Sequence, residues 1–377
     1  MRPRFLTRTL AVLTLLTACT DPADTGAEDL NDRQLGADAS PACRAAMRGA
    51  ADFLAATAED DATAAAAAYA GDLRAYVRTL DAAATRSDDV AITEALASAD
   101  GEGAALAEGR LLTALSLELR ARLASVETGA EDKFAAWDEG HCLWDGALRG
   151  LARRVDTTAG DTIEADIDAA FAAGHDAISG APPATTVDDW RTPPMRQVIE
   201  KTLLRAVHRR LLALASAARS AADPLAATRA LGLFGALEDR LKDRNTPGIA
   251  DITAMLSGDP AAIDPDALRV ELDLAFAKRT RKYCDEAFEG GLGVPTSYKG
   301  AVEGRTYARL LAVGMARAGQ DVEAYLRDWD DYAVHVQTGA DLEAAQRVSD
   351  RLIAATCAYQ SALGVAACTS SEDEVAP

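Results

Sequence analysis

The sequence lacks the motifs by which most enzyme classes are identified. It contains no GxSxG, HExxH, GxxxxGK[ST] or GxGxxG pattern, the arrangements that present a nucleophile, a zinc ion or a phosphate-binding loop. It has four histidines in 377 residues, and histidine is the commonest general base. We therefore predict a protein without catalytic residues, whose function is binding or scaffolding.

Positive charge is scarce. The chain has 39 lysines and arginines against 59 aspartates and glutamates, and its formal net charge is −20. Nucleic acids and anionic lipid surfaces would repel such a chain. We therefore predict no nucleic-acid partner, while the charge is compatible with an exported protein or with cation binding.

Long apolar runs are missing beyond the N-terminus. The run from Leu10 to Ala18 follows a basic start and is too short to span a bilayer, which is typical of an export signal. It ends in Leu16-Thr17-Ala18-Cys19, which resembles the lipobox of bacterial lipoproteins. The alternative is a plain secretory signal with a cysteine at this position by chance.

The lipobox resemblance implies that residues 1–18 are removed and that Cys19 carries covalent lipid. Several acyl chains would anchor the protein stably in a membrane, whereas one chain binds only marginally. Loss of the three arginines in the leader changes the net charge from −20 to −23. Thr20 follows Cys19, so the aspartate typical of inner-membrane retention is absent there. The expected location is the bacterial cell envelope, at the outer membrane, facing the periplasm or the cell surface.

Composition divides the mature chain into segments. Residues 19–41 are acidic and small, and such a segment cannot bury enough apolar surface to offset its ordering entropy, which predicts a flexible tether. Proline pairs in 179–194 (SGAPPATTVDDWRTPP) indicate a hinge. The expected order is a tether (19–41), an N-terminal helical half (42–180), a C-terminal helical half (195–366) and an acidic tail (367–377).

Apolar residues recur at three- and four-residue spacing, without sustained alternation, and no proline occurs between residues 42 and 181. This periodicity is typical of helices. We predict an all-α protein, either a multi-helix bundle or a helical repeat array, with about 10–12 helices. The expected helices are 42–58, 62–84, 103–125, 130–154, 160–178, 195–220, 223–242, 264–289, 298–318, 320–336 and 340–363.

Five cysteines remain after Cys19, and an exported chain meets an oxidising environment in which disulfides form. Five thiols allow at most two bridges with one thiol left over, in fifteen pairings that the sequence does not separate. No CxxC pair occurs, so a zinc ribbon or a thioredoxin-like site has no support. The candidate disulfide cysteines are Cys43, Cys142, Cys284, Cys357 and Cys368.

Three segments look alike when they are aligned on a glutamate. They are LAEGRLLTALSLEL around Glu108, VIEKTLLRAVHRRL around Glu200 and AVEGRTYARLLAVG around Glu303. A second pair of similar segments spans 162–180 and 267–288. Such self-similarity indicates internal duplication, although helical sequence of low complexity also produces it by chance.

The repeated glutamates have two interpretations. Carboxylates from packed helices could converge on a hard cation such as iron. Alternatively, each carboxylate pairs with a nearby basic residue, such as Arg110, Lys201 or Arg305. Glycine follows two of the glutamates, at Gly109 and Gly304. A glycine inside a helix costs about 1 kcal/mol relative to alanine and is tolerated where another backbone or a ligand approaches closely.

The segment AWDEGHCLWD (136–145) gathers several polar side chains. Asp138 and His141 are three residues apart on one helix face, the spacing at which a carboxylate and an imidazole can share a metal. The alternative is that Trp137 and Trp144 form a buried stripe, with His141 at its rim and Cys142 in the core or in a disulfide. We favour the structural alternative.

WDEGHCLWDGAL, QVIEKTLLRAVHRRL and AVEGRTYARLL together resemble helical periplasmic regions associated with bacterial iron permeases. The resemblance covers residues 100–320 and implies an iron-handling accessory protein that uses Glu108, Glu200 and Glu303, with an envelope or metal-transport protein as partner. The chain has no Arg-Glu-x-x-Glu motif, unlike an iron permease itself. Our leading prediction is a lipid-anchored, non-catalytic binding or scaffold protein that requires no cofactor besides its lipid, and iron binding is the alternative.

Overall fold

The computed structural model describes residues 34–180, 184–365 and 368. Over these residues the protein is all-α, as predicted, with one small sheet. The leader, Cys19 and most of the acidic tail lie outside the described residues. The first helices are α1 (Pro41–Ala58), α2 (Ala62–Tyr69), α3 (Asp72–Ala84), α4 (Asp88–Leu96), α5 (Gly101–Thr128), α6 (Lys133–Leu143), α7 (Arg149–Ala159) and α8 (Ile163–His175). The later ones are α9 (Thr192–Ala221), α10 (Pro224–Lys242), α11 (Thr246–Leu256), α12 (Pro265–Gly290), α13 (Pro295–Arg317), α14 (Val322–Thr338) and α15 (Leu342–Ala362).

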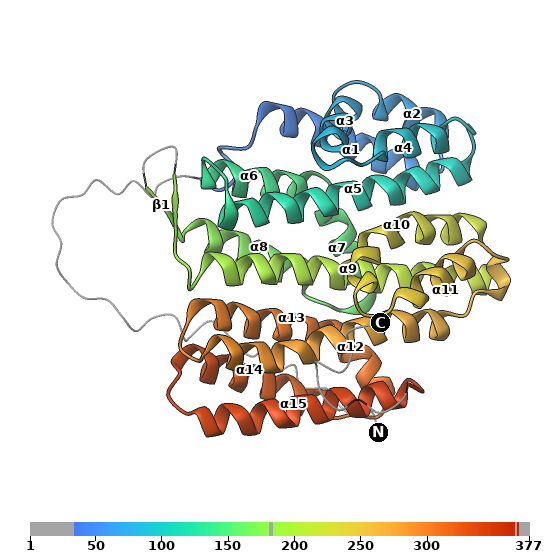
Figure 1. Cartoon of the computed structure of the whole chain (residues 1–377). Helices are drawn as coiled ribbons and strands as arrows, with labels where there is room; N and C mark the ends of the chain where they lie inside the picture. Colours follow the sequence, from blue (N-terminus) through green and yellow to red (C-terminus); the bar gives the residue numbers. More distant parts are fainter. Residues whose placement is uncertain (1–33, 181–183, 366–367, 369–377) are drawn as a thin grey trace, which may run out of the picture.

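The helices stack in successive layers along the chain, from α1–α4 at one end to α14 and α15 at the other (Figure 1). Helices of the two predicted halves pack directly, α5 against α10 and α8 against α9. One hydrophobic core extends from Cys43 to Tyr359 through both halves. No helix among the described residues has the length and apolar character that crossing a membrane requires.

Glycines allow α5 and α10 to cross in close contact. A Cβ on Gly109 of α5 would lie 2.7 Å from Cα of Gly232 on α10. Another backbone therefore occupies the space beside Gly109, as the sequence predicted for a glycine inside a helix. A Cβ on Gly304 would instead meet the ring of Trp329, at 2.4 Å.

The helix boundaries differ from the prediction where turn signals were misread. The expected helix 62–84 is interrupted at Gly71, whose φ of 79° ends one helix and begins the next. Helix α4 was not predicted, and the Asp81 carboxylate accepts hydrogen bonds from its first two backbone N–H groups. Helix α11 was also missed, because Asn245 is its N-cap and Pro247 lies in its first turn. The expected helix 130–154 contains a π-helical segment, η1 (Trp144–Leu148), and a short 3₁₀ helix, η2 (Pro260–Ala262), precedes α12.

The described part of the predicted hinge forms regular structure. It contains the strands β1 (Ile178–Ser179) and β2 (Thr186–Val187), which pair antiparallel with Ile178 opposite Val187. Helix α9 already begins at Thr192, inside the expected hinge. Pro193 and Pro194 stand in its first turn, where proline costs no backbone hydrogen bond.

Among the described cysteines two disulfides form and one thiol is left over, within the limit that five cysteines allow. Cys43 on α1 pairs with Cys142 on α6, and Cys357 pairs with Cys368. Cys284 is free and buried. The first bridge spans 99 residues of chain and ties the first helix to the sixth.

The similar segment 162–180 contains α8 and the segment 267–288 lies within α12, and each is followed by a long helix, α9 or α13. Phe171 on α8 meets the His141 ring edge to face, and Phe276 on α12 meets His208 in the same way. Internal duplication stays a prediction that this similarity supports.

Candidate functional site

Three side chains of α6 bind the first described residues to the helical body through two hydrogen bonds and a disulfide. Asp138 Oδ2 accepts a hydrogen bond from the backbone N–H of Asp38 at 2.8 Å. Glu139 Oε2 accepts one from the N–H of Ser40 at 2.9 Å, and Cys142 forms the disulfide to Cys43. The last residues of the predicted tether (19–41) are therefore bound to the body, because α6 supplies acceptors for their backbone.

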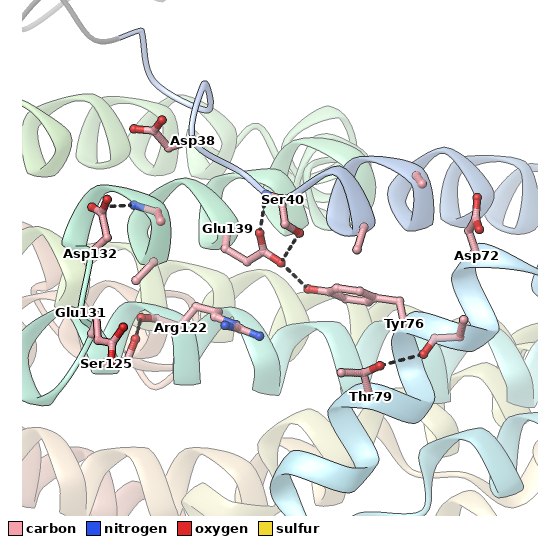
Figure 2. A pocket seen from close by; sticks show the side chains of 16 residues that line it. Asp38, Ser40, Asp72, Tyr76, Thr79, Arg122, Ser125, Glu131, Asp132 and Glu139 are labelled. Carbon is pink, nitrogen blue, oxygen red and sulfur yellow. Dashed lines mark hydrogen bonds between the residues drawn. The ribbon is translucent and has the colours of Figure 1, made fainter. Parts of the chain in front are cut away.

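Glu139 lies at the centre of this attachment and is 7% exposed. Its Oε1 accepts hydrogen bonds from Ser40 Oγ at 3.1 Å and from the Tyr76 hydroxyl at 3.2 Å. Figure 2 shows the carboxylate between these two side chains. Burial raises the pKa of Tyr76, and the Glu139 charge raises it further. The phenol therefore stays protonated and remains a donor.

A cavity of about 640 Å³, which we call the acidic cavity, opens beside Glu139. Its walls come from the segment before α1, from α1, α3, α5 and α6, and from the connection between α5 and α6 (Figure 2). The basic side chain among the lining residues that the structure describes is Arg122, which donates to Glu118 Oε1 at 2.6 Å. The carboxylates that line the cavity are Asp38, Asp72, Glu131, Asp132 and Glu139.

The predicted pair of Asp138 and His141 takes part in separate contacts. The Asp138 carboxylate is fully buried and faces His175 Nε2 at 3.8 Å. The His141 ring lies edge to face on Phe171, and burial lowers its pKa although Asp145 acts in the opposite direction. Both tryptophans of the segment AWDEGHCLWD are fully buried and Cys142 is disulfide-bonded, which confirms the structural alternative for these three residues.

The structure brings together two of the three repeated glutamates. Lys201 Nζ lies 2.9 Å from Glu200 Oε2 and 2.9 Å from Glu303 Oε1. Arg196 adds a second cation to Glu200, at 2.8 Å. Burial alone would raise the pKa of Glu200, but Lys201 and Arg196 outweigh it and lower the pKa to about 2. An ammonium ion therefore occupies the position that the cation prediction assigned to a metal.

Glu108 lies elsewhere, 2.9 Å from Arg229 Nε, a partner 121 residues away in the sequence. The ion-pair interpretation fits all three glutamates, although Glu108 and Glu303 take partners other than Arg110 and Arg305. Arg305 lies instead 3.5 Å from Asp330. Among the residues that the structure describes, no group of three or more His, Cys, Asp or Glu side chains is placed to hold a metal ion.

Sequence reasoning did not identify Glu139, Ser40 and Tyr76 as a group. Their hydrogen bonds join residues 63 and 99 positions apart, and no helical periodicity relates such positions. The only local signal was the density of polar side chains in the segment AWDEGHCLWD.

Comparison of the chain with protein-family models, with curated proteins and with solved structures finds no significant match. The resemblance to regions associated with iron permeases therefore stays a prediction.

Proposed function

We propose that this chain is a lipid-anchored, non-catalytic binding protein of the bacterial cell envelope, and that the acidic cavity holds its ligand. The observation that carries the proposal is the position of the cavity. Asp38, Ser40 and Ala42 line it, and they stand where the tether predicted from Cys19 joins the body. A ligand in this cavity would be held at the attachment point, close to the membrane.

The charge of the cavity defines the class of ligand. Five carboxylates and one guanidinium line it, and carboxylates accept hydrogen bonds but donate none when ionised. Its volume of about 640 Å³ lies within the range of roughly 300–1,000 Å³ that is typical of small-molecule sites. We therefore propose an organic cation with several amino groups as the ligand.

The anchor is tested by mass spectrometry of the protein extracted from the membranes of a producing bacterium. We expect a chain that begins at Cys19 and carries acyl groups. A Cys19→Ser variant should appear in the soluble fraction. An unacylated chain in the membrane fraction, or a Cys19→Ser variant that stays there, would contradict the proposal.

The ligand is tested by calorimetric titration of the detergent-solubilised full chain with spermidine. Replacement of two exposed carboxylates of the cavity, in the variant Asp72→Asn/Glu131→Gln, should weaken binding about tenfold, since each exposed charge pair contributes up to about 1 kcal/mol. The matched control is Asp251→Asn/Asp259→Asn, which removes the same charge from outside the cavity lining and should leave binding unchanged. Equal loss in both variants would indicate non-specific attraction to an acidic chain.

Iron binding through Glu200 and Glu303 is the second candidate, since their carboxylates lie on one cation. Iron would have to displace the Lys201 ammonium from two contacts of 2.9 Å. Elemental analysis of tag-free protein tests this candidate. Bound iron that is lost in Glu303→Gln would support it, while iron-free protein without a thermal shift on adding iron salts would remove it.

A further inference from the structure

A second cavity, of about 230 Å³, lies between α9, α12 and α13, and we call it the basic cavity. Its apolar wall consists mainly of Leu212, Leu310 and Val313. Among the described residues of its lining there is no aspartate or glutamate, although acids outnumber bases in the whole chain. Its basic side chains are His208, Arg209, Arg269 and Arg317.

His208 is a buried polar side chain that makes a hydrogen bond through only one of its two ring nitrogens among the described residues. The side chain is 5% exposed, and its Nε2 lies 2.8 Å from Asp273 Oδ1. The second oxygen of Asp273 accepts a hydrogen bond from the Tyr359 hydroxyl. These contacts orient the imidazole ring with the Nε2 proton directed at the carboxylate. The other ring nitrogen, Nδ1, has no hydrogen-bond partner among the described residues, and a buried polar atom without a partner destabilises the folded protein.

The arginines of the basic cavity are held in place without being saturated. Arg209 Nη1 lies 2.6 Å from Asp161, and Arg269 and Arg317 both approach Asp266. A guanidinium has five N–H donors, so each of these contacts leaves donors over. The Nε of Arg209 is buried without a hydrogen-bond partner among the described residues.

We propose that the basic cavity binds a small carboxylate with an apolar body and a hydroxyl group. The arginines would hold the carboxylate, because guanidinium groups match its geometry and charge. The leucines and valine would cover the hydrocarbon part. The hydroxyl, which can both donate and accept a hydrogen bond, would pair with His208 Nδ1. A volume of about 230 Å³ is below the roughly 300–1,000 Å³ of sites for drug-sized ligands, so the ligand is small.

The experiment is calorimetric titration of the full chain with 2-hydroxyhexanoate, hexanoate and hexylammonium. We expect 2-hydroxyhexanoate to bind about 3- to 10-fold more tightly than hexanoate, the gain from one hydrogen bond. Hexylammonium, which has the same apolar body and the opposite charge, should show no binding that depends on Arg317. If neither carboxylate binds at concentrations up to about 10 mM, any affinity is weaker than the millimolar range. That result would overturn the proposal.

Variants locate the binding. Arg317→Gln should weaken binding of both carboxylates about fivefold or more, since one charge-assisted contact is lost. The matched control Arg327→Gln removes an equally exposed arginine on α14, outside the cavity lining, and should have no effect. His208→Gln should abolish the preference for the hydroxyl group. If that variant does not fold, Arg317→Gln still decides the location, and unchanged affinity in it would overturn the proposal.

These results separate this site from the acidic cavity. Spermidine binding should be unchanged in Arg317→Gln, and carboxylate binding should be unchanged in Asp72→Asn/Glu131→Gln. Failure of one cavity to bind its probe would therefore leave the other proposal standing.

Discussion

The acidic cavity and the basic cavity stabilise their central polar groups in different ways. In the acidic cavity, Glu139 accepts hydrogen bonds from neutral donors, the Ser40 N–H and hydroxyl and the Tyr76 phenol. On the C-terminal side of the molecule, buried carboxylates contact cationic side chains or an imidazole ring. The carboxylates of Glu200 and Glu303 contact the Lys201 ammonium, and the Asp273 carboxylate contacts the His208 ring.

This difference indicates which groups are available to a ligand. Glu139 accepts hydrogen bonds from neutral donors, and the one guanidinium of the described lining, Arg122, is paired with Glu118. Five carboxylates against one guanidinium leave the negative charge of the acidic cavity incompletely compensated, which fits the cationic ligand proposed for it. The cluster of Lys201, Glu200 and Glu303 is internally compensated, as expected of a structural network. In the basic cavity, the pairing of His208 with Asp273 leaves one nitrogen without a partner among the described residues. Incomplete compensation, more than the number of charges, distinguishes the two proposed sites from the structural ion pairs.

The largest expected effect comes from removing the cation of the C-terminal network. Lys201→Met should lower the free energy of unfolding by about 3–5 kcal/mol, because it leaves the buried Glu303 carboxylate without its ammonium partner and Glu200 with Arg196 alone. Tyr76→Phe in the acidic cavity removes one of several donors to Glu139 and should cost about 1.5 kcal/mol. Urea unfolding measures both. The double variant Lys201→Met/Glu303→Gln should recover part of the loss, and equal losses in the two single variants would contradict the contrast.

The two disulfides lie at opposite ends of the molecule and close chain segments of different length, so their contributions to stability can be compared. The Cys43–Cys142 bridge closes a separation of 99 residues and the Cys357–Cys368 bridge one of 11. The chain-entropy relation assigns about 4.7 kcal/mol to a loop of about 100 residues and about 3 kcal/mol to one of about 15. Paired Cys→Ala variants, compared by urea unfolding, should show the larger loss for the first bridge. The reverse order would show that native-state contacts dominate.

Substitution of Gly314 tests whether the packing around Asp273 is needed for binding in the basic cavity. A Cβ there would lie 1.9 Å from the Tyr359 hydroxyl oxygen and 2.4 Å from Asp273 Oδ2. Gly314→Ala should therefore cost about 1–3 kcal/mol, as overpacking does, and should weaken carboxylate binding by displacing Asp273. Gly150→Ala is the matched control. It lies in α7 with open space around it and should stabilise the protein by up to about 1 kcal/mol.

The smallest expected effect is a pH dependence near the attachment of residues 38–43. Burial lowers the pKa of His141 from its ordinary value of 6.5, so the unfolded chain binds this proton more readily than the folded one. Stability contributed by neutral His141 is therefore present above pH 6.5 and falls as the pH drops below it. Thermal unfolding between pH 7.5 and 5.5 should show a flatter pH dependence in His141→Gln. An unchanged slope would assign the dependence to other groups.

The helices are local features, and most of them could be predicted. The expected helix 264–289 corresponds closely to α12 (Pro265–Gly290), and 42–58 corresponds to α1. The errors occur at residues whose side chains can form either a turn or the start of a helix. Asn245 followed by Thr-Pro indicated a turn but begins a helix, and both outcomes use the same side-chain hydrogen bonds to backbone N–H groups.

The sequence by itself determined the all-α class and the limit of two disulfides with one thiol left over, because helical period and cysteine number are readable along the chain. It left open whether the repeated glutamates bind a cation or form ion pairs. Only the tertiary structure decided the partners. Ser40 meets Glu139 from 99 residues away, and His208 meets Asp273 from 65 residues away. Such contacts depend on how helices stack, and a helix of a given amphipathic pattern can be buried against many neighbours. The charge of each cavity therefore follows from the packing, while the charge of each helix follows from its residues.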